Sequence, residues 1–135
     1  MSPDVEKMIA SKGGYCNKDL PYPAYDTLHP NYKGIDELEN VAQTFVTGQM
    51  CGTSSYGLTS MYSAPLELFS KVVGYGENND GLVGYSSCAL NSENFTSDFR
   101  SQFYSVEANH VDGTCRTGDA WFGSAKPCSF YVGKM

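Results

Sequence analysis

The chain has 135 residues, enough for one hydrophobic core, and we expect residues 1–135 to form a single domain or part of one. Hydrophobic residues make up 41% of the chain and charged residues 18%, which is typical of a globular protein. The net charge is −6 and the nine Lys and Arg residues are scattered, so no nucleic-acid partner is expected. No apolar run approaches the roughly 20 residues of a membrane span, and no signal peptide follows Met1.

The first part of the chain is expected to hold a helix, a loop and a strand, in that order. Ser2-Pro3-Asp4 is typical of a helix start, so we predict a helix over residues 2–11. Three prolines mark residues 17–34 as a surface loop. Residues 41–47 are mostly apolar and β-branched, which predicts a buried strand.

The remaining residues alternate between loops and short regular elements. Residues 48–60 are rich in Gly, Ser and Thr and predict a loop. Apolar residues recur on one helical face over residues 65–73, which predicts an amphipathic helix followed by a loop over residues 74–83. Residues 102–108 alternate in polarity and predict a half-buried strand. The tail over residues 113–135 is rich in Gly and aromatic residues.

Five cysteines occur in the chain, none in C-x-x-C spacing, and His29 and His110 do not complete a zinc pattern. Disulfides are therefore expected, and with them a secreted or extracellular location. Cys115 and Cys128 flank a Gly-rich aromatic loop, which a bridge would stabilise by about 3 kcal/mol, and we predict that pair. The sequon at Asn94 predicts N-glycosylation and agrees with this location.

Two segments thirty residues apart carry a candidate catalytic pair. Residues 79–83, Asn-Asp-Gly-Leu-Val, contain Asp80, and residues 109–112, Asn-His-Val-Asp, contain His110. An Asp can orient a His that takes the proton from a serine hydroxyl, and the two residues occur here in the order Asp, then His. Asn-Asp-Gly alone is more often a turn, and a lone His is more often a hydrogen-bonded surface residue. Their combination favours the catalytic interpretation.

A nucleophilic serine is missing from this pattern, because no Gly-x-Ser-x-Gly occurs in the sequence. The nearest approximation is Ser54, within Gly-Thr-Ser-Ser-Tyr-Gly. A nucleophile elbow needs small residues two positions before and after the serine, and Tyr56 fills the second position. Ser54 also lies only 26 residues before Asp80, too close for the intervening strands. Ser54 is therefore expected to belong to a polar loop.

The sequence Asn-Asp-Gly-Leu-Val, a Cys a few positions later and a strand ending in Asn-His-x-Asp resemble the C-terminal part of secreted triacylglycerol lipases. The match covers residues 78–88 and 104–112, and between residues 16 and 73 it rests on the order of elements. The resemblance implies an α/β fold, the C-terminal portion of an α/β-hydrolase, with an incomplete sheet, flanking helices and long disulfide-linked loops. It implies Asp80 as the triad acid and His110 as the base.

The resemblance further implies a disulfide between Cys16 and Cys88, which would leave Cys51 over. The odd number of cysteines agrees with one thiol that lacks a partner within the chain. The resemblance also implies that an N-terminal hydrolase portion supplies the serine and the oxyanion hole, and that the substrate is an ester or a lipid.

Asp112 matches the position of a calcium ligand in the bacterial members of the family that the chain resembles. Arg116, however, stands where a further ligand would be expected, and no Asp lies about twenty residues before Asp80. No cofactor is therefore expected, and calcium at Asp112 stays an open alternative.

Two functions follow from this pattern. In the first, the chain is the C-terminal portion of a secreted serine ester hydrolase and supplies its Asp and His. In the second, it is a disulfide-stabilised extracellular binding or structural module that performs no chemistry.

Overall fold

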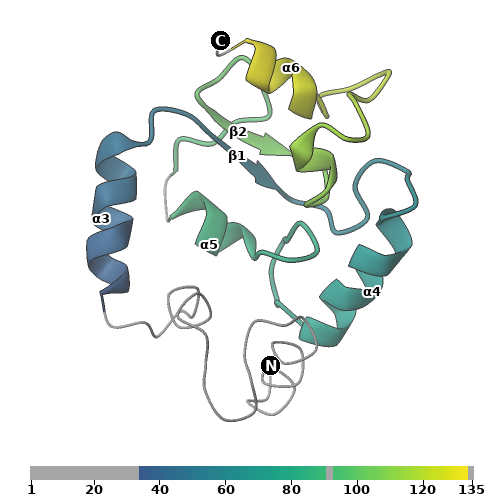
Figure 1. Cartoon of the computed structure of the whole chain (residues 1–135), viewed down its shortest axis with the longest axis horizontal. Helices are drawn as coiled ribbons and strands as arrows, with labels where there is room; N and C mark the ends of the chain where they lie inside the picture. Colours follow the sequence, from purple (N-terminus) through teal and green to yellow (C-terminus); the bar gives the residue numbers. More distant parts are fainter. Residues whose placement is uncertain (1–33, 91–92, 134–135) are drawn as a thin grey trace. The chain divides into compact units, whose positions relative to one another are not determined.

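The computed structural model describes residues 34–90 and 93–133 (Figure 1). The chain forms two compact units, residues 1–45 and 46–135. The expected features that lie outside the described residues are the helix over residues 2–11, nearly all of the loop over residues 17–34, Cys16 and His29.

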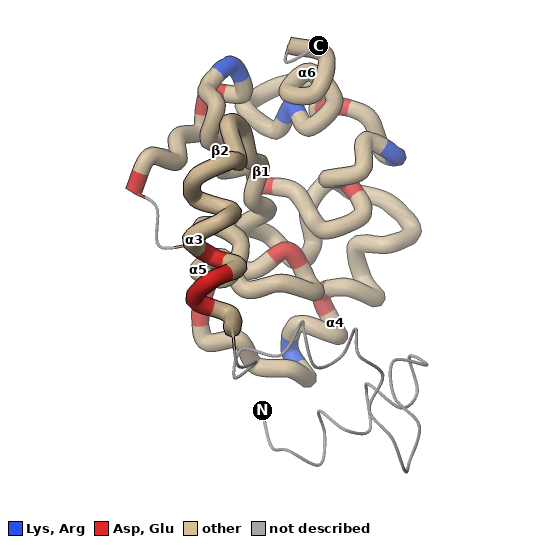
Figure 2. Tube along the Cα trace, turned by 60° about the vertical axis from the view of Figure 1, so that its left-hand side comes forward, with Lys and Arg blue, Asp and Glu red and all other residues tan. Residues whose placement is uncertain are grey.

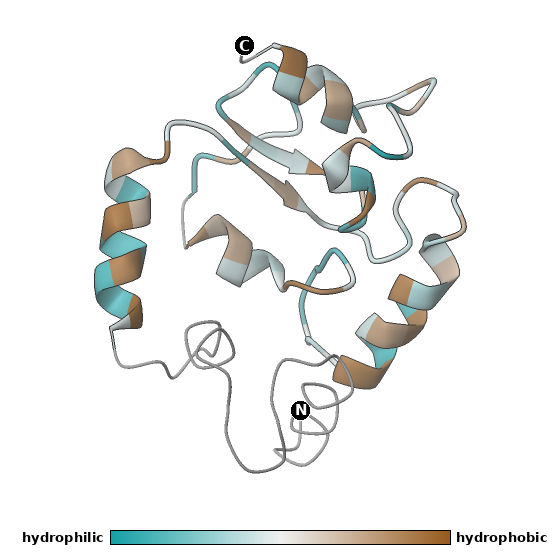
Figure 3. Ribbon diagram, viewed as in Figure 1, coloured by the Kyte–Doolittle hydropathy of each residue, from teal (hydrophilic) through white to brown (hydrophobic). Residues whose placement is uncertain are grey.

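The described part of the first unit is one helix, α3 (Ile35–Phe45), with Asp36 and Glu37 in its first turn. Carboxylates there interact favourably with the helix dipole. The strand predicted over residues 41–47 is wrong, because residues 41–45 belong to this helix. A short apolar run does not distinguish a strand from a helix, and the wider spacing here is helical. In Figure 3 apolar and polar residues alternate around α3. The apolar residues at helical spacing are Ile35, Leu38, Ala42 and Phe45.

The second unit contains a parallel sheet of two strands, β1 (Gln49–Gly52) and β2 (Phe103–Val106), whose first residues lie opposite each other. β2 lies within residues 102–108, and the strand predicted there is confirmed. β1 lies within residues 48–60, so the loop predicted there is wrong for these four residues. This stretch has little strand propensity of its own, and its pairing with β2 and the burial of Cys51 stabilise it instead.

The longest helix of the second unit is α4 (Ser63–Val73), which confirms the amphipathic helix predicted over residues 65–73. It ends at Gly74, whose φ of 67° is left-handed and whose N–H donates to the carbonyl of Ser70. Glycine adopts this conformation without a steric penalty, which is why it terminates helices in this way.

Three short helices were not predicted: α5 (Tyr85–Ala89), η1 (Asp112–Thr114) and α6 (Pro127–Val132). Each is too short for a periodic apolar pattern to reveal it. α6 begins at a proline, and the carboxylate of Asp119 accepts hydrogen bonds from the backbone of its first turn. The described residues therefore form a small mixed α/β fold of four α-helices and one two-stranded parallel sheet. None of the described helices is long and apolar enough to span a membrane.

The core of the second unit lies between β2 and α6. The rings of Tyr104 and Phe130 stack there, with their centroids 5.6 Å apart. Met50, Phe99 and Ala125 are partly buried against this core. The buried apolar residues that form it are Tyr104, Val106, Ala108 and Phe130.

Two disulfides occur in the second unit. The predicted bridge between Cys115 and Cys128 is present, with Cα atoms 5.0 Å apart. The expected pairing of Cys16 with Cys88 is wrong, because Cys88 is bonded to Cys51, the residue that was expected to be left over. Cys51 is fully buried in β1, and its Cα atom lies 5.8 Å from that of Cys88 in α5. Both bridges are consistent with an extracellular location.

Candidate active site

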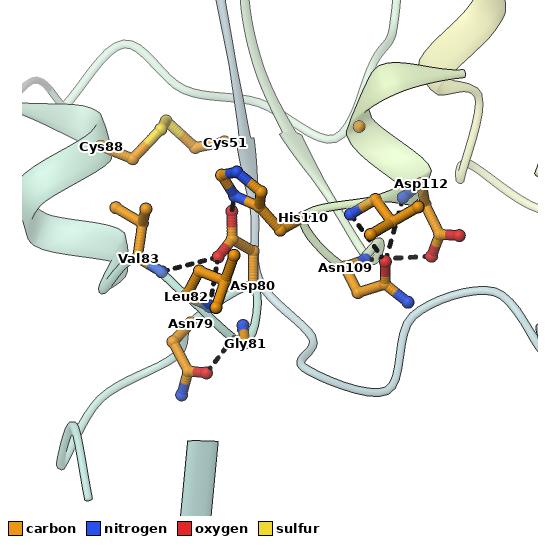
Figure 4. A network of polar contacts seen from close by, with 12 residues as sticks. Cys51, Asn79, Asp80, Gly81, Leu82, Val83, Cys88, Asn109, His110 and Asp112 are labelled. Carbon is orange, nitrogen blue, oxygen red and sulfur yellow. Dashed lines mark hydrogen bonds and ion pairs between the residues drawn. A yellow bond between two sulfur atoms is a disulfide. The ribbon is translucent and has the colours of Figure 1, made fainter. Parts of the chain in front are cut away.

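Asp80 and His110 lie together in the second unit, as the catalytic interpretation requires. The Nδ1 atom of His110 lies 2.7 Å from Oδ2 of Asp80 (Figure 4). The side chain of Asp80 is 14% exposed and that of His110 is 45% exposed. The carboxylate of Asp80 is thus largely covered, whereas the imidazole of His110 is open to solvent.

Asp80 is held in place by the turn that its own motif forms. Its Oδ1 atom accepts hydrogen bonds from the backbone N–H groups of Leu82 and Val83, at 3.0 and 2.8 Å. Gly81 has a φ of 99°, and its N–H donates to Oδ1 of Asn79. Asn-Asp-Gly therefore forms a turn, in which one carboxylate oxygen of Asp80 accepts from backbone N–H groups and the other is left for His110.

His110 is positioned by its neighbour Asn109, which is only 1% exposed. Oδ1 of Asn109 accepts from the N–H groups of Val111 and Asp112, both at 3.0 Å. Its Nδ2 donates to the carbonyl of Tyr56 at 2.9 Å. Asn109 thereby forms the turn on which His110 sits and ties it to a second loop. The local pattern Asn-x-x-Asp is the signal that could have revealed this role from the sequence.

Asp112 is fully buried, and three protein groups donate to its carboxylate. Oδ2 accepts from the N–H groups of Leu58 and Asn109 at 2.7 and 3.1 Å, and Oδ1 accepts from the hydroxyl of Thr117 at 2.6 Å. No cluster of three metal-ligating side chains occurs among the described residues. Asp112 therefore joins three loops through hydrogen bonds, and this arrangement does not fit a calcium ion.

The end of β1 and the loop that follows it pack directly against the segments that carry Asp80 and His110. A Cβ atom on Gly52 would lie 2.7 Å from Cβ of Asp80, and 2.6 Å from the carbonyl oxygen of Ala108. Gly57 has a φ of 60°, and a Cβ atom there would lie 2.2 Å from Oδ2 of Asp112. Both positions require glycine, because any side chain would displace the segments that carry Asp80 and His110.

Ser54 lies in this same loop, and its Oγ atom accepts a hydrogen bond from the N–H of Gly57 at 3.0 Å. Such a contact stabilises a turn. It agrees with the expectation that Ser54 belongs to a polar loop.

The electrostatics of the pair favour charge separation. Burial raises the pKa of Asp80, but the hydrogen bonds from His110 and from the N–H groups of Leu82 and Val83 outweigh it and hold that pKa below its usual value. The hydrogen bond to Asp80 raises the pKa of His110, and burial opposes this only in part. Asp80 thus stays ionised and stabilises the imidazolium form of His110. With Nδ1 directed at the carboxylate, Nε2 is the nitrogen that can exchange a proton with a substrate group.

Asn94 is exposed and lies two residues before Thr96, which forms an isolated parallel β-bridge with Tyr104 of β2. Thr96, the last residue of the sequon, donates its N–H to the carbonyl of Phe103 and accepts from the N–H of Ser105. N-glycosylation at Asn94 stays a prediction.

Comparison of the chain with protein families, with curated proteins and with solved structures finds no match.

Proposed function

We propose that this chain supplies the acid and the base of a serine ester hydrolase of the lipase or carboxylesterase type. The nucleophile and the oxyanion hole would lie on an N-terminal portion of the same secreted enzyme. The observation that carries the proposal is the 2.7 Å contact between Asp80 and His110, with the other carboxylate oxygen of Asp80 held by two backbone N–H groups. This is the arrangement that a His needs to act as a base at neutral pH.

The chemistry assigns one role to each residue. Nε2 of His110 takes the proton from the serine hydroxyl while the serine oxygen attacks the ester carbonyl. Asp80 stabilises the imidazolium that results. His110 then returns this proton to the departing alcohol, and an acyl-serine remains. In the second half His110 takes a proton from a water molecule whose oxygen attacks the acyl carbon. The bond between the acyl carbon and the serine oxygen then breaks, the carboxylic acid leaves, and His110 returns the proton to the serine oxygen.

The sheet supports the need for a partner portion. All-parallel sheets occur almost only in α/β proteins in which other elements cover both faces of the sheet. Only two strands, β1 and β2, are paired in the described part of the chain. A partner that extends this sheet would bring its own strands, and with them the serine, beside the loops that carry Asp80 and His110.

The test uses a short-chain p-nitrophenyl ester and the secreted protein that contains this chain. We expect turnover, labelling of a serine outside residues 1–135 by a fluorophosphonate, and loss of both with His110→Ala. Asp80→Asn should lower kcat by about 10⁴-fold, as loss of the acid does in serine proteases. Asp98→Asn is the matched control, because Asp98 is exposed and outside the pair.

Two results would contradict the proposal. Turnover by the 135-residue chain alone that is lost with Ser54→Ala would place the nucleophile in this chain. A fluorophosphonate-inert protein with no esterase activity would instead favour a binding or structural module, with Asp80 and His110 as a structural ion pair.

A further inference from the structure

Two adjacent aromatic side chains of the second unit, Trp121 and Phe122, lie almost fully in water. Their exposed fractions are 93% and 90%, the highest among the large hydrophobic residues of the described part of the chain. They lie in the loop between η1 and α6, which projects beside α6 in Figure 1. Single exposed apolar residues are ordinary on protein surfaces, but two neighbouring exposed aromatic rings indicate an interaction site.

Hydrogen bonds hold the loop over residues 118–125 in shape. The N–H of Ala120 donates to the carbonyl of Ala125 at 2.9 Å, which closes the loop below the two rings. The hydroxyl of the buried core residue Tyr104 donates to the carbonyl of Ser124. The disulfide between Cys115 and Cys128 joins the flanking segments. These bonds tie the base of the loop to the core, so the exposed rings belong to a defined structure.

The surroundings of the two rings carry no excess of negative charge. Asp119 is the acid nearest to them in the sequence, and its carboxylate is engaged by the backbone of α6 and by the hydroxyl of Ser129. Arg116 and Lys126 flank the loop, and Figure 2 shows Lys and Arg segments interspersed with Asp and Glu segments in the region around α6. The net charge of the whole chain, by contrast, is −6.

The size of the site distinguishes between two kinds of partner. Two aromatic side chains bury at most about 500 Å² together, whereas a stable protein interface needs about 800 Å² on each side. A lipid surface sets no such minimum, and tryptophan prefers the interface between headgroups and acyl chains. The local charge also suits lipids, because membrane surfaces are neutral or negative.

We infer that the loop over residues 118–125 anchors this protein to a phospholipid surface by inserting Trp121 and Phe122 among the headgroups. This inference goes beyond the proposed ester hydrolysis and requires neither Asp80 nor His110. The anchor is weak and reversible, because it comprises only two side chains.

The test measures binding of the 135-residue chain to phosphatidylcholine vesicles. Trp121 is the only tryptophan of the sequence, so its fluorescence reports directly on the tip of the loop. We expect its emission to shift to shorter wavelengths when vesicles are added, and brominated phosphatidylcholine to quench it. Phe122→Ser keeps the reporter and should weaken partitioning by about tenfold, since burial of one aromatic ring is lost.

Vesicle flotation extends the test to variants that lack the fluorophore. The double variant Trp121→Ser, Phe122→Ser should no longer float with the vesicles, while its far-ultraviolet circular dichroism stays unchanged. Met61→Ser with Leu68→Ser is the matched control, because these residues are 79% and 65% exposed but lie outside the loop. This control should bind as the wild type does. His110→Ala should also bind normally, which separates this test from that of ester hydrolysis.

Three results would overturn the inference. The first is unchanged Trp121 emission at saturating vesicle concentration. The second is equal flotation of the double variant and the wild type. The third is a shift of emission that appears without vesicles as the protein concentration is raised, which would identify a second copy of the chain as the partner.

Discussion

Asp80 and His110 are joined by two hydrogen bonds, one between their side chains and one between their main chains. The N–H of His110 donates to the carbonyl of Asp80 at 2.8 Å, in addition to the 2.7 Å contact between Nδ1 and Oδ2. The main-chain bond does not titrate. It therefore holds the two segments together whether or not the imidazole carries a proton, and the side-chain bond can change strength without separating them.

The pKa of His110 should fall when Asp80 is replaced by Asn. The hydrogen bond and the charge of Asp80 both raise this pKa, so the amide should allow it to return toward its ordinary value. A proton NMR titration of the imidazole measures it, with His29→Gln to assign the two histidine signals. An identical titration curve for Asp80→Asn would contradict the contact.

The pair should also make stability depend on pH. The pKa of His110 is raised, so its contribution is fully present below its unfolded pKa and is lost as pH rises through the folded one. The pKa of Asp80 is lowered, so its contribution is present above its unfolded pKa and is lost as pH falls through the folded one. The free energy of unfolding of the wild type should therefore exceed that of His110→Gln by the largest margin between about pH 4 and pH 6.5. Urea unfolding of both proteins over a range of pH measures this difference. A pH-independent difference would contradict this expectation.

Gly57→Ala should destabilise the second unit more than Gly76→Ala. Both glycines have a positive φ, 60° and 72°, so alanine suffers a similar backbone strain at either position. Only at Gly57 does the new Cβ atom collide, with Oδ2 of Asp112 and with the N atom of Asn109. We expect an extra loss of about 1–3 kcal/mol in the free energy of unfolding. Equal losses would show that the loop adjusts without strain.

Asn109→Ala should destabilise the protein by about 1–3 kcal/mol and alter the environment of His110. The variant removes the acceptor of two backbone N–H groups and the donor to the carbonyl of Tyr56, at a position that is almost fully buried. Urea unfolding measures the loss, and the NMR signal of His110 reports the altered turn. Asn78→Ala is a suitable control, because Asn78 is exposed and should tolerate the change.

Removal of the Cys51–Cys88 bridge should cost more stability than removal of Cys115–Cys128. The bridged residues are 37 and 13 positions apart, and in the chain-entropy model the losses are about 4 and about 3 kcal/mol. Paired Cys→Ser variants and urea unfolding measure this order. Peptide mapping without reduction checks the pairing itself, and a peptide that links Cys16 to Cys88 would contradict the structure.

Local chemistry in the sequence was enough to predict several features of this protein. The helix at α4 follows from its apolar period and its terminal glycine, and the bridge between Cys115 and Cys128 closes a short loop. The turn at Asn79-Asp80-Gly81 likewise depends on contacts within a few residues. Each of these features is decided by neighbours along the chain, which a single sequence displays.

Other features depend on partners that are distant in the sequence, and only the tertiary structure decided them. β1 forms because β2 offers it hydrogen bonds, although its own residues resemble a loop. Cys51 pairs with Cys88 because β1 and α5 pack together, a proximity that no local pattern encodes. Asp112 is a candidate metal ligand in the sequence, but in the fold three protein groups donate hydrogen bonds to its carboxylate. The sequence identified Asp80 and His110 as candidates, but their contact exists because the fold brings together two segments that are separated by twenty-nine residues and joins their main chains.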